Sequence, residues 1–533
     1  MHYKITTVGF YDAMGTSAVE FILNQTQMTT IVCSGFYVNK LVQMKADGMA
    51  QHITALVSLD EVENDVLTKA EDCNITVHTF AAVMQAGESA ASSAPAFEES
   101  DRDDFYMFSY TSGTTGDSKG VMLTHNNILS QAFTSIPRIN LAKGDAVISY
   151  LPYPHSYEQI LTATSLLLGL RIGFYQGDPL KLVEDCAELK PAFFPSVPRL
   201  YNKIYGKLTA GIAAKGAAVR WLITKGLNAK LAQLNRNGAV THGCYDKLFA
   251  KFRVILGGKV KLMTTGSAPI DKKVLDFLKV CFSVPIIEGY GLTETATGGG
   301  TTDMKDPVTG HVGGPSEAIK IRLKDLPEME YLSSDKPYPR GEICLKGPCV
   351  FKGYYKREDK TAEAFDEAGW FMTGDVGVIY PNGSVKIIDR SKNIFKLSQG
   401  EYIAPEKLEN IFTLSPFIAQ SMVYGDSLKS CTVAIVIPDE PAIEKWQKEK
   451  GLGSVEDVLQ DAAFKKAIQD DMVRLATENK LSSLEKPKDI HLSADAFTIE
   501  NDQLTPTFKL KRNNAKKAYQ EQLDAMYAAL EPS

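Results

Sequence analysis

The sequence predicts an α/β protein with a large first domain and a small α+β domain at its C-terminal end. Three observations lead to this prediction. Short apolar runs typical of strands alternate with helical patterns through most of the chain. The chain has 533 residues, more than an ordinary single domain contains. Beyond about Asp389, charged helical patterns surround an apolar strand-like run.

The alternation favours a large domain of mixed and parallel sheets flanked by helices. We expect strands at residues 30–33, 55–59, 75–80, 106–111, 146–151, 171–175, 192–197 and 260–265. We expect helices at residues 18–24, 127–135, 180–189 and 272–281, and a long basic helical region at 198–236. Residues 86–104 contain few large apolar side chains and are expected to form a flexible connector.

A domain boundary is expected at Asp389. Residues 1–388 would then form the large domain, and residues 389–533 the small one. In the second part we expect a helix at 405–412, a strand at 431–437, charged helices between 442 and 480, and a basic tail after Pro506.

The composition excludes several classes of protein. A net charge of −6 argues against nucleic acid as the main partner, because phosphate backbones select basic surfaces. The eight cysteines form no CxxC pair and no zinc-like cluster with histidine, which indicates reduced thiols. Residues 161–173 are too short to span a membrane and are expected to be a buried helix running into a strand. We therefore expect a cytoplasmic protein, with peripheral contact to the endoplasmic reticulum or another organelle membrane left open.

A glycine- and threonine-rich loop lies between two strand-like runs. Its glycines would let backbone N–H groups approach phosphate oxygens, its hydroxyls add donors, and its lysine adds a cation. The spacing is not that of a Walker loop, and an ordinary hairpin turn is the alternative. The residues concerned are Thr111, Ser112, Gly113, Thr114, Thr115, Gly116 and Lys119.

Two further segments follow strand-like runs and have the composition of ligand-binding turns. Glu294 is a hard carboxylate of the kind that Mg²⁺ prefers. Taken alone, each segment is more often a plain turn at a strand end. The first contains Gly266, Ser267 and Ala268, and the second Glu288, Gly289, Tyr290, Gly291, Thr293 and Glu294.

Residues 385–406 join a strand-like run to a basic cluster and a glycine turn. The strand ends at Asp389 and Arg390, and the turn contains Gly400 and Glu401. Cations beside a turn suit a phosphorylated ligand, while a solvated basic face is the alternative. Near the C-terminus, residues 504–512 read LTPTFKLKR, a basic stretch that could equally be solvated.

In this order, the segments resemble the adenylate-forming (AMP-binding) superfamily. The amino-acid sequences of residues 385–406, 177–186 and 194–201 resemble those of its long-chain fatty acyl-CoA synthetase branch. The resemblance implies that the glycine-rich loop binds phosphates, that Ser267, Ala268 and Tyr290 frame adenine, and that Asp375 accepts from the ribose hydroxyls. It also implies that Thr293 lies at the α-phosphate, Glu294 at Mg²⁺ and Arg390 at the ribose or phosphate. The small C-terminal domain would be mobile, with Asp389 as its hinge and Lys509 as its catalytic lysine. His155, Gly400 and Glu401 would lie on the acyl and coenzyme A path.

The function implied by the resemblance is ATP-dependent ligation of a long-chain fatty acid to coenzyme A through an acyl-adenylate, with ATP and Mg²⁺ as cofactors. In relatives a substantial region precedes the segment that resembles residues 8–15, so the resemblance implies a large domain that is incomplete at its start. A weakly active or silent nucleotide- and fatty-acid-binding form, and another adenylate-forming ligase, remain alternatives.

Overall fold

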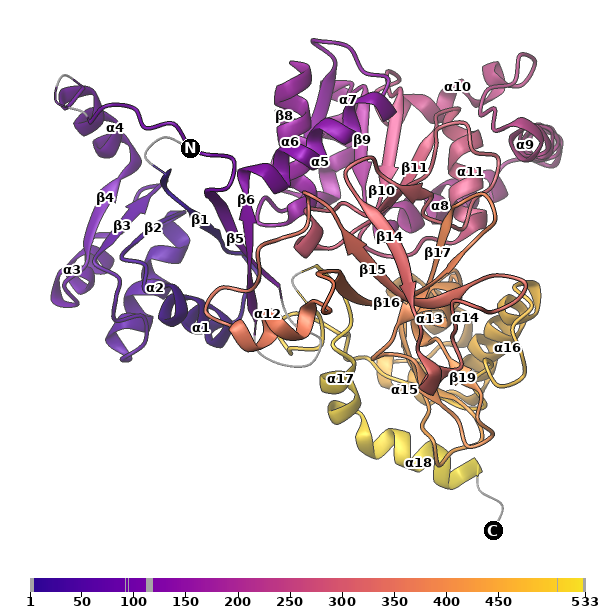
Figure 1. The fold of residues 1–533 in the computed structure, drawn as a ribbon. Coiled ribbons are helices and arrows are strands. Elements are labelled where there is room, and N and C mark those ends of the chain that lie inside the picture. Colours follow the sequence, from indigo (N-terminus) through magenta and orange to yellow (C-terminus); the bar gives the residue numbers. More distant parts are fainter. Residues whose placement is uncertain (1–3, 92, 94, 112–117, 506, 531–533) are drawn as a thin grey trace.

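The computed structural model describes residues 4–91, 93, 95–111, 118–505 and 507–530 (Figure 1). The N-terminal elements form one lobe, the central sheet and its helices a second, and the C-terminal elements a third.

The N-terminal lobe contains a parallel sheet in the order β2-β3-β4. Helices α1 and α2 supply seven of the sixteen buried residues in its apolar core, including Ile22, Leu23 and Val38. Beside it, β1 and β6 pair with the two edges of β5. The elements are β1 (Thr7–Gly9), α1 (Thr16–Thr26), β2 (Thr30–Cys33), α2 (Gly35–Ala46), β3 (Ala55–Ser58), α3 (Asn64–Asp72), β4 (Thr76–Thr79), α4 (Phe80–Ser89), β5 (Phe105–Thr111) and β6 (Lys119–Thr124).

The largest sheet among the described residues is mixed, in the order β13-β12-β11-β10-β9-β7-β8. Its strands from β11 to β8 are parallel, and all four residues of β9 are buried, as expected for a strand covered on both faces. The strands are β7 (Ala146–Ser149), β8 (Arg171–Phe174), β9 (Phe193–Ser196), β10 (Leu262–Thr265), β11 (Ile286–Tyr290), β12 (Gly300–Thr301) and β13 (Gly314–Pro315).

Seven helices belong to this part of the described chain. Their ends follow ordinary capping chemistry: Asp271, for example, accepts hydrogen bonds from the backbone N–H groups of Lys273 and Val274. The helices are α5 (His125–Ser135), α6 (Ser156–Leu168), α7 (Leu182–Leu189), α8 (Pro198–Ala213), α9 (Ala217–Asn237), α10 (Asp246–Val254) and α11 (Lys272–Phe282).

An antiparallel sheet, β14-β15-β16-β17, leads to the C-terminal lobe. It contains β14 (Lys320–Lys324), β15 (Arg340–Lys346), β16 (Phe371–Ile379) and β17 (Val385–Arg390), with α12 (Glu358–Ala364) in a connection. Asp389 lies in β17, beside its last residue, Arg390. The domain boundary at Asp389 stays a prediction.

The C-terminal lobe packs helices against a sheet in the order β20-β21-β22. Leu408, Phe412, Phe464 and Ile468 form part of its buried core. Leu414 packs against both this core and the core of the central lobe. The elements are β18 (Phe395–Lys396), β19 (Tyr402–Ile403), α13 (Pro405–Phe412), β20 (Ile418–Tyr424), β21 (Val433–Pro438), α14 (Glu440–Lys450), α15 (Val455–Gln460), α16 (Ala462–Glu478), β22 (Ile490–Leu492), α17 (Arg512–Ala518) and α18 (Gln520–Leu530).

The predicted α/β class with mixed sheets and flanking helices is confirmed. Two details of the sequence interpretation were wrong. The connector begins later than residue 86, because α4 continues to Ser89. The segment 161–173 is a helix running into a strand, but Leu166 and Leu167 are 69% and 42% exposed, so its outer face is not buried. Within the described residues, no helix combines the length and apolar character needed to cross a membrane.

Candidate active site

A cavity of about 2840 Å³ opens at the carboxyl ends of the parallel strands β9, β10 and β11. This edge is where open α/β sheets usually bind ligands. The volume exceeds the roughly 300–1,000 Å³ of an ordinary small-molecule pocket. It is large enough for more than one substrate. Residues of the central lobe, of β14–β17 and of the C-terminal lobe all line it.

The cavity brings together most of the described residues that the sequence predicted for the site. These are Thr111, Lys119, His155, Gly266, Ser267, Ala268, Glu288, Gly289, Tyr290, Gly291, Thr293, Glu294, Asp375, Asp389, Arg390 and Lys509. Ser112, Gly113, Thr114, Thr115 and Gly116 lie outside the described residues. Gly400 and Glu401 do not line the cavity; they form the turn between β18 and β19.

Tyr290, Asp375 and Arg390 form one hydrogen-bonded and ionic group, which we call the nucleotide wall. The Tyr290 hydroxyl donates to Asp375 Oδ2 at 2.8 Å, and Arg390 Nε lies 3.3 Å from Asp375 Oδ1. Asp375 on β16 is paired in register with Arg390 on β17. The neighbouring Asp375 carboxylate raises the pKa of the Arg390 guanidinium. The wall therefore presents a buried carboxylate and a permanent cation to the cavity.

Two glycine positions let backbone segments approach each other closely behind this wall. A Cβ atom at Gly291 would lie 2.0 Å from the Thr297 carbonyl oxygen, and one at Gly266 would lie 3.3 Å from the Gly289 carbonyl oxygen. Glu288 is buried beside them, and its Oε2 atom has no hydrogen-bond partner among the described residues. Burial raises the pKa of Glu288 to about 8. This carboxyl is therefore mostly protonated at neutral pH.

Tyr354 contacts both Glu294 and Lys119. The Tyr354 hydroxyl donates to Glu294 Oε1 at 2.8 Å, while Lys119 Nζ lies 4.9 Å from the centre of the Tyr354 ring. Burial lowers the pKa of Lys119, and the Glu294 carboxylate opposes this change. Among the described residues, no group of three acidic, histidine or cysteine side chains could hold a metal ion by itself. Glu294 fits a Mg²⁺ ion that takes its other ligands from phosphates and water.

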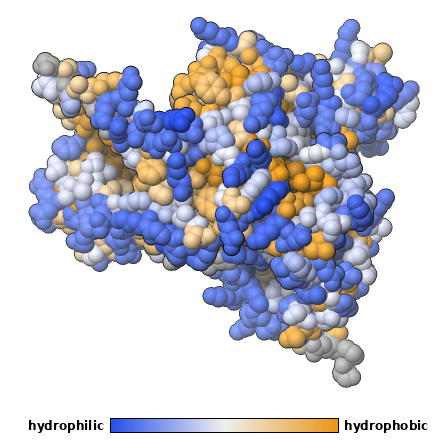
Figure 2. Space-filling view, viewed as in Figure 1, coloured by the Kyte–Doolittle hydropathy of each residue, from blue (hydrophilic) through white to orange (hydrophobic). Residues whose placement is uncertain are grey.

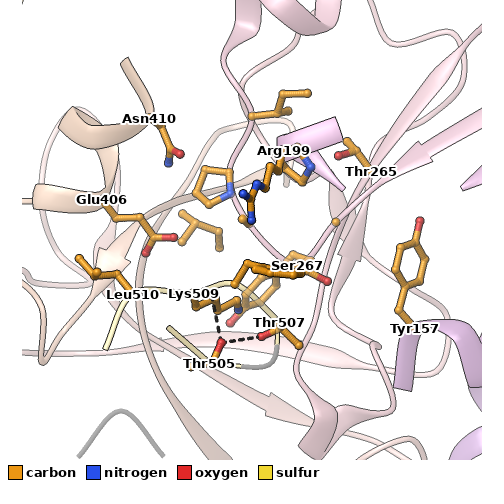
Figure 3. Close-up of a pocket in the computed structure, with 18 of the residues that line it drawn as sticks. Tyr157, Arg199, Thr265, Ser267, Glu406, Asn410, Thr505, Thr507, Lys509 and Leu510 are labelled. Atoms are coloured by element: carbon orange, nitrogen blue, oxygen red, sulfur yellow. Dashed lines mark hydrogen bonds between the residues drawn. The ribbon is translucent and has the colours of Figure 1, made fainter. Parts of the chain in front are cut away.

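Residues 504, 505 and 507–512, which we call the lysine strip, bring Lys509 to the cavity from the C-terminal lobe. The Lys509 backbone N–H donates to Thr505 Oγ1 at 3.0 Å, and Thr505 Oγ1 lies 2.9 Å from Thr507 Oγ1 (Figure 3). Burial and the nearby Arg390 cation lower the pKa of Lys509, while Glu406, Asp375 and Glu294 raise it. Lys509 therefore lines the same cavity as the charged groups of the nucleotide wall.

Phe508, the residue before Lys509, has a φ of +61°. This left-handed conformation is easy for glycine and costly for other residues. Here the Arg199 guanidinium carbon lies 4.7 Å from the centre of the Phe508 ring. That cation–π contact joins α8 to the lysine strip.

His155 caps the N-terminus of α6. Its Nδ1 atom accepts a hydrogen bond from the Tyr157 backbone N–H at 3.1 Å. Burial lowers the pKa of His155 to about 4, and the Lys509 ammonium adds to this effect. His155 is therefore a neutral imidazole close to Lys509. Its local contact is structural, and its predicted role on the acyl and coenzyme A path stays a prediction.

Asp389 is buried at the junction with the C-terminal lobe. Its carboxylate accepts hydrogen bonds from the backbone N–H groups of Arg390 at 2.6 Å and Glu406 at 3.0 Å. Burial raises the pKa of Asp389 to about 7, and the nearby Glu406 carboxylate adds to the shift. The residue thus ties β17 to the start of α13, and a hinge at this point stays a prediction.

The sequence interpretation missed three residues of the site. Tyr354 orients Glu294, Arg199 stacks on Phe508, and Glu406 lies near Lys509. Figure 3 shows Glu406, Lys509, Arg199 and Ser267 around one pocket, with Ser267 drawn beside Lys509. The signal available for Glu406 was its position directly after Pro405, at the first turn of an expected helix. Gly353 and the charged residues that follow Tyr354 were a local signal for Tyr354, and Arg199 lies within the segment 194–201 that carries the resemblance.

Residues 1–355 match a protein-family model that is described as "AMP-binding enzyme". The chain belongs to this family. An AMP-binding enzyme of Arabidopsis thaliana, "Long chain acyl-CoA synthetase 6, peroxisomal", is 39% identical over 531 residues, which cover 99% of this chain and 75% of the relative. "Long-chain-fatty-acid--CoA ligase 1" of Homo sapiens is 37% identical over 537 residues, covering 99% and 76%.

Solved structures of two other proteins have the same architecture as this chain. The A domain of a carboxylic acid reductase from Segniliparus rugosus, solved with AMP and a co-purified carboxylic acid, superposes with a TM-score of 0.78. It is 26% identical, and the match covers 99% of this chain and 79% of that one. The corresponding domain from Mycobacterium chelonae gives a TM-score of 0.78 at 27% identity, covering 98% and 76%.

Proposed function

We propose that this AMP-binding enzyme joins a long-chain fatty acid to coenzyme A by way of an acyl-adenylate. The observation that carries the proposal is that Lys509 lines the same cavity as Glu294, Asp375 and Arg390. The names of the relatives, a long chain acyl-CoA synthetase and a long-chain-fatty-acid ligase, support the choice of acid.

In the first half-reaction, a carboxylate oxygen of the fatty acid bonds to the α-phosphorus of ATP. The bond from that phosphorus to pyrophosphate breaks. Asp375 holds the ribose hydroxyls, Lys119 and Arg390 face phosphates, and the Lys509 ammonium stabilises charge that develops on the phosphoryl oxygens. Mg²⁺, held by Glu294, would supply further neutralisation of the phosphate charge.

In the second half-reaction, the thiol of coenzyme A loses its proton to solvent, its sulfur bonds to the acyl carbon, and the bond from that carbon to AMP breaks. We infer that residues 389–533 act as a small domain that turns about Asp389 between the two steps. This movement would withdraw the lysine strip and bring the turn at Gly400 and Glu401 to the cavity. In the present orientation that turn lies elsewhere, while Lys509 lines the cavity. The orientation therefore suits adenylate formation.

The apolar part of the cavity suits an acyl chain. Ile139, Ile160, Leu161 and Phe193 line it on the side of α5, α6 and β9. We assign the acyl chain to this side and the nucleotide to the side of Tyr290. A cytoplasmic location with peripheral membrane contact completes the proposal, since the substrate is a lipid.

Pyrophosphate release tests the proposal. Purified protein mixed with ATP, Mg²⁺ and palmitate should release pyrophosphate, and addition of coenzyme A should give palmitoyl-CoA and AMP. Phenylalanine in place of palmitate serves as the control for an amino-acid-activating enzyme. Pyrophosphate release with phenylalanine and none with palmitate would contradict the proposal. Binding of ATP without release of pyrophosphate from either acid would instead support a silent binding protein.

A further inference from the structure

Helices α8, α9 and α10, residues 198–254, carry an unusual concentration of positive charge. This segment contains eleven lysines and arginines and one acidic residue, Asp246, whereas the whole chain has 58 basic and 64 acidic residues. We call this part of the central lobe the basic lobe. Asp246 is paired with Lys230, which is buried. The other ten cations are all exposed.

The charge of the basic lobe is not neutralised by neighbouring elements. None of its ten exposed cations forms an ion pair with another residue in the described part of the chain. An ordinary solvated surface carries both signs of charge interspersed. A surface of one sign attracts polyanions or anionic membranes instead.

Exposed apolar side chains stand among these cations at the start of α9. Trp221 is 64% exposed, Val219 49% and Leu222 42%, and Lys225 Nζ lies 5.1 Å from the centre of the Trp221 ring. All residues from 217 to 222 are exposed. Basic residues next to tryptophan and aliphatic side chains are the combination found on helices that lie at a bilayer surface.

The packing of α9 explains why this end protrudes. Ile223, Gly226 and Leu234 are buried, and α9 packs mainly against α11. A Cβ atom at Gly226 would lie 3.0 Å from the Phe249 ring, so this face is closely packed. Residues 217–222, which precede Ile223 on α9, are exposed instead. In Figure 1, α9 lies at the outer edge of the central lobe, away from the C-terminal lobe.

The basic lobe also borders the cavity. Lys203, Lys207 and Ala213 of α8 line the cavity, and α9 begins a few residues later at Ala217. Figure 2 shows a mostly hydrophilic surface in the region of α9 and α10. A surface bound by this lobe would therefore lie next to the cavity wall.

We propose that the start of α9, with Trp221 and Leu222 inserted and Arg220 and Lys225 on lipid phosphates, docks the enzyme on an anionic membrane. A bilayer fits better than nucleic acid, because Val219 and Leu222 offer aliphatic surface that a phosphate backbone does not use. The docking rests on the proposed function only in that it would supply a lipid substrate beside the cavity. Vesicle binding measures it without any turnover.

Flotation with vesicles tests the docking. The full chain should float with vesicles of phosphatidylcholine mixed with phosphatidylserine, but not with phosphatidylcholine alone, and high salt should release it. Arg220→Glu with Lys225→Glu should weaken binding at least about tenfold, since each cation near an anionic surface contributes about a fivefold gain in affinity. Trp221→Ser with Leu222→Ser should weaken binding several-fold.

A matched control separates docking from general exposure of apolar side chains. Phe36→Ser changes a ring on α2 that is 80% exposed, and this variant should bind vesicles like the parent protein. The α9 positions do not line the cavity, so pyrophosphate release from detergent-dispersed palmitate should be unchanged in both double variants. Their melting temperatures should match the parent.

Several outcomes would overturn the docking. They are equal flotation of the α9 variants and the parent, equal binding to both kinds of vesicle, and binding to an RNA duplex that vesicles fail to displace. Vesicle binding by a chain that releases no pyrophosphate would instead overturn the proposed function and leave the docking standing.

Discussion

The nucleotide wall and the lysine strip face each other across one cavity but are held in place differently. The wall links β11, β16 and β17 through the contacts of Tyr290 and Arg390 with Asp375. The strip is anchored to its own lobe, where Arg512 donates to Glu409 at 2.9 Å. Its contact with α8 includes the stack of Arg199 on Phe508.

This difference separates two kinds of catalytic contribution. Groups that hold the nucleotide in both half-reactions benefit from a rigid sheet, because their geometry need not change. A cation required only in the first step can sit on a movable part, provided that one orientation brings it to the phosphate. Substitutions in the wall and the strip should therefore give different patterns across the two half-reactions.

The largest expected effect comes from Lys509→Ala in the lysine strip. Adenylate formation should fall about 10²–10³-fold, because a preorganised cation is lost from the transition state. Thioester formation from preformed acyl-adenylate should change little. Single-turnover assays of each half-reaction measure the two rates. Lys511→Ala is the matched control, since Lys511 pairs with Asp502 instead. Equal losses in both half-reactions would show that Lys509 serves both steps.

The second prediction concerns Asp389→Pro, at the junction between β17 and the C-terminal lobe. Proline restricts φ to about −65°, so it should trap one orientation of the small domain. We expect near-normal exchange of pyrophosphate into ATP and a loss of coenzyme A ester formation of roughly tenfold or more.

The control for this variant is Asp389→Asn, which keeps a backbone free to rotate and an acceptor for the Glu406 N–H. It should turn over normally. Because the proline variant also removes both hydrogen bonds of the carboxylate, its melting temperature must be compared with that of the asparagine variant. Full ester turnover by a folded proline variant would place the hinge elsewhere.

A smaller effect is expected from Tyr290→Phe in the nucleotide wall. The change removes the hydroxyl that donates to Asp375 at 2.8 Å. A hydrogen bond of this kind contributes about 0.5–1.5 kcal/mol, so the KM for ATP should rise about threefold to tenfold. Binding of the acyl-adenylate should weaken by a similar factor. Tyr424→Phe, which removes a hydroxyl that donates to Asp426, is the control. If Tyr290→Phe weakened only one half-reaction, the prediction that the nucleotide wall serves both half-reactions would be wrong.

Parts of the wall could be predicted from sequence because their signals are local. A strand followed by glycines and an acidic residue marks the ends of β10 and β11, and these ends converge in a parallel sheet. The class of fold followed from the same alternation of patterns. The positions of Ser267, Tyr290 and Glu294 at one edge of the sheet needed no long-range information beyond this topology.

Contacts between lobes could not be predicted in this way. The stack of Arg199 on Phe508 joins residues more than 300 positions apart and depends on the orientation of the C-terminal lobe. The hydrogen bond from Tyr354 to Glu294 depends on how the connection before α12 folds back over β6. The lowered pKa of His155 likewise depends in part on Lys509, which belongs to the C-terminal lobe. Such contacts follow from tertiary packing, which no local pattern encodes.

The smallest effect on either half-reaction is expected from Glu158→Gln, which lies behind the cavity on α6. Glu158 is 2% exposed and accepts a hydrogen bond from the Ser149 hydroxyl. Burial raises its pKa from 4.5 to about 7. The folded protein therefore keeps this proton at pH values where the unfolded chain has lost it. The contribution of Glu158 to the free energy of unfolding therefore falls as the pH rises from about 4.5 to about 7, and this contribution stays low above that range.

The glutamine variant should lack this fall, because its amide does not titrate. Its melting temperature relative to the parent should therefore rise between pH 5 and pH 8, while both half-reactions at pH 8 proceed as in the parent. Thermal melting at several pH values in one buffer series measures the difference. Parallel profiles for the two proteins would mean that Glu158 titrates as it does in the unfolded chain. An altered half-reaction would mean that this carboxyl belongs to the site after all, and not to the scaffold behind the wall.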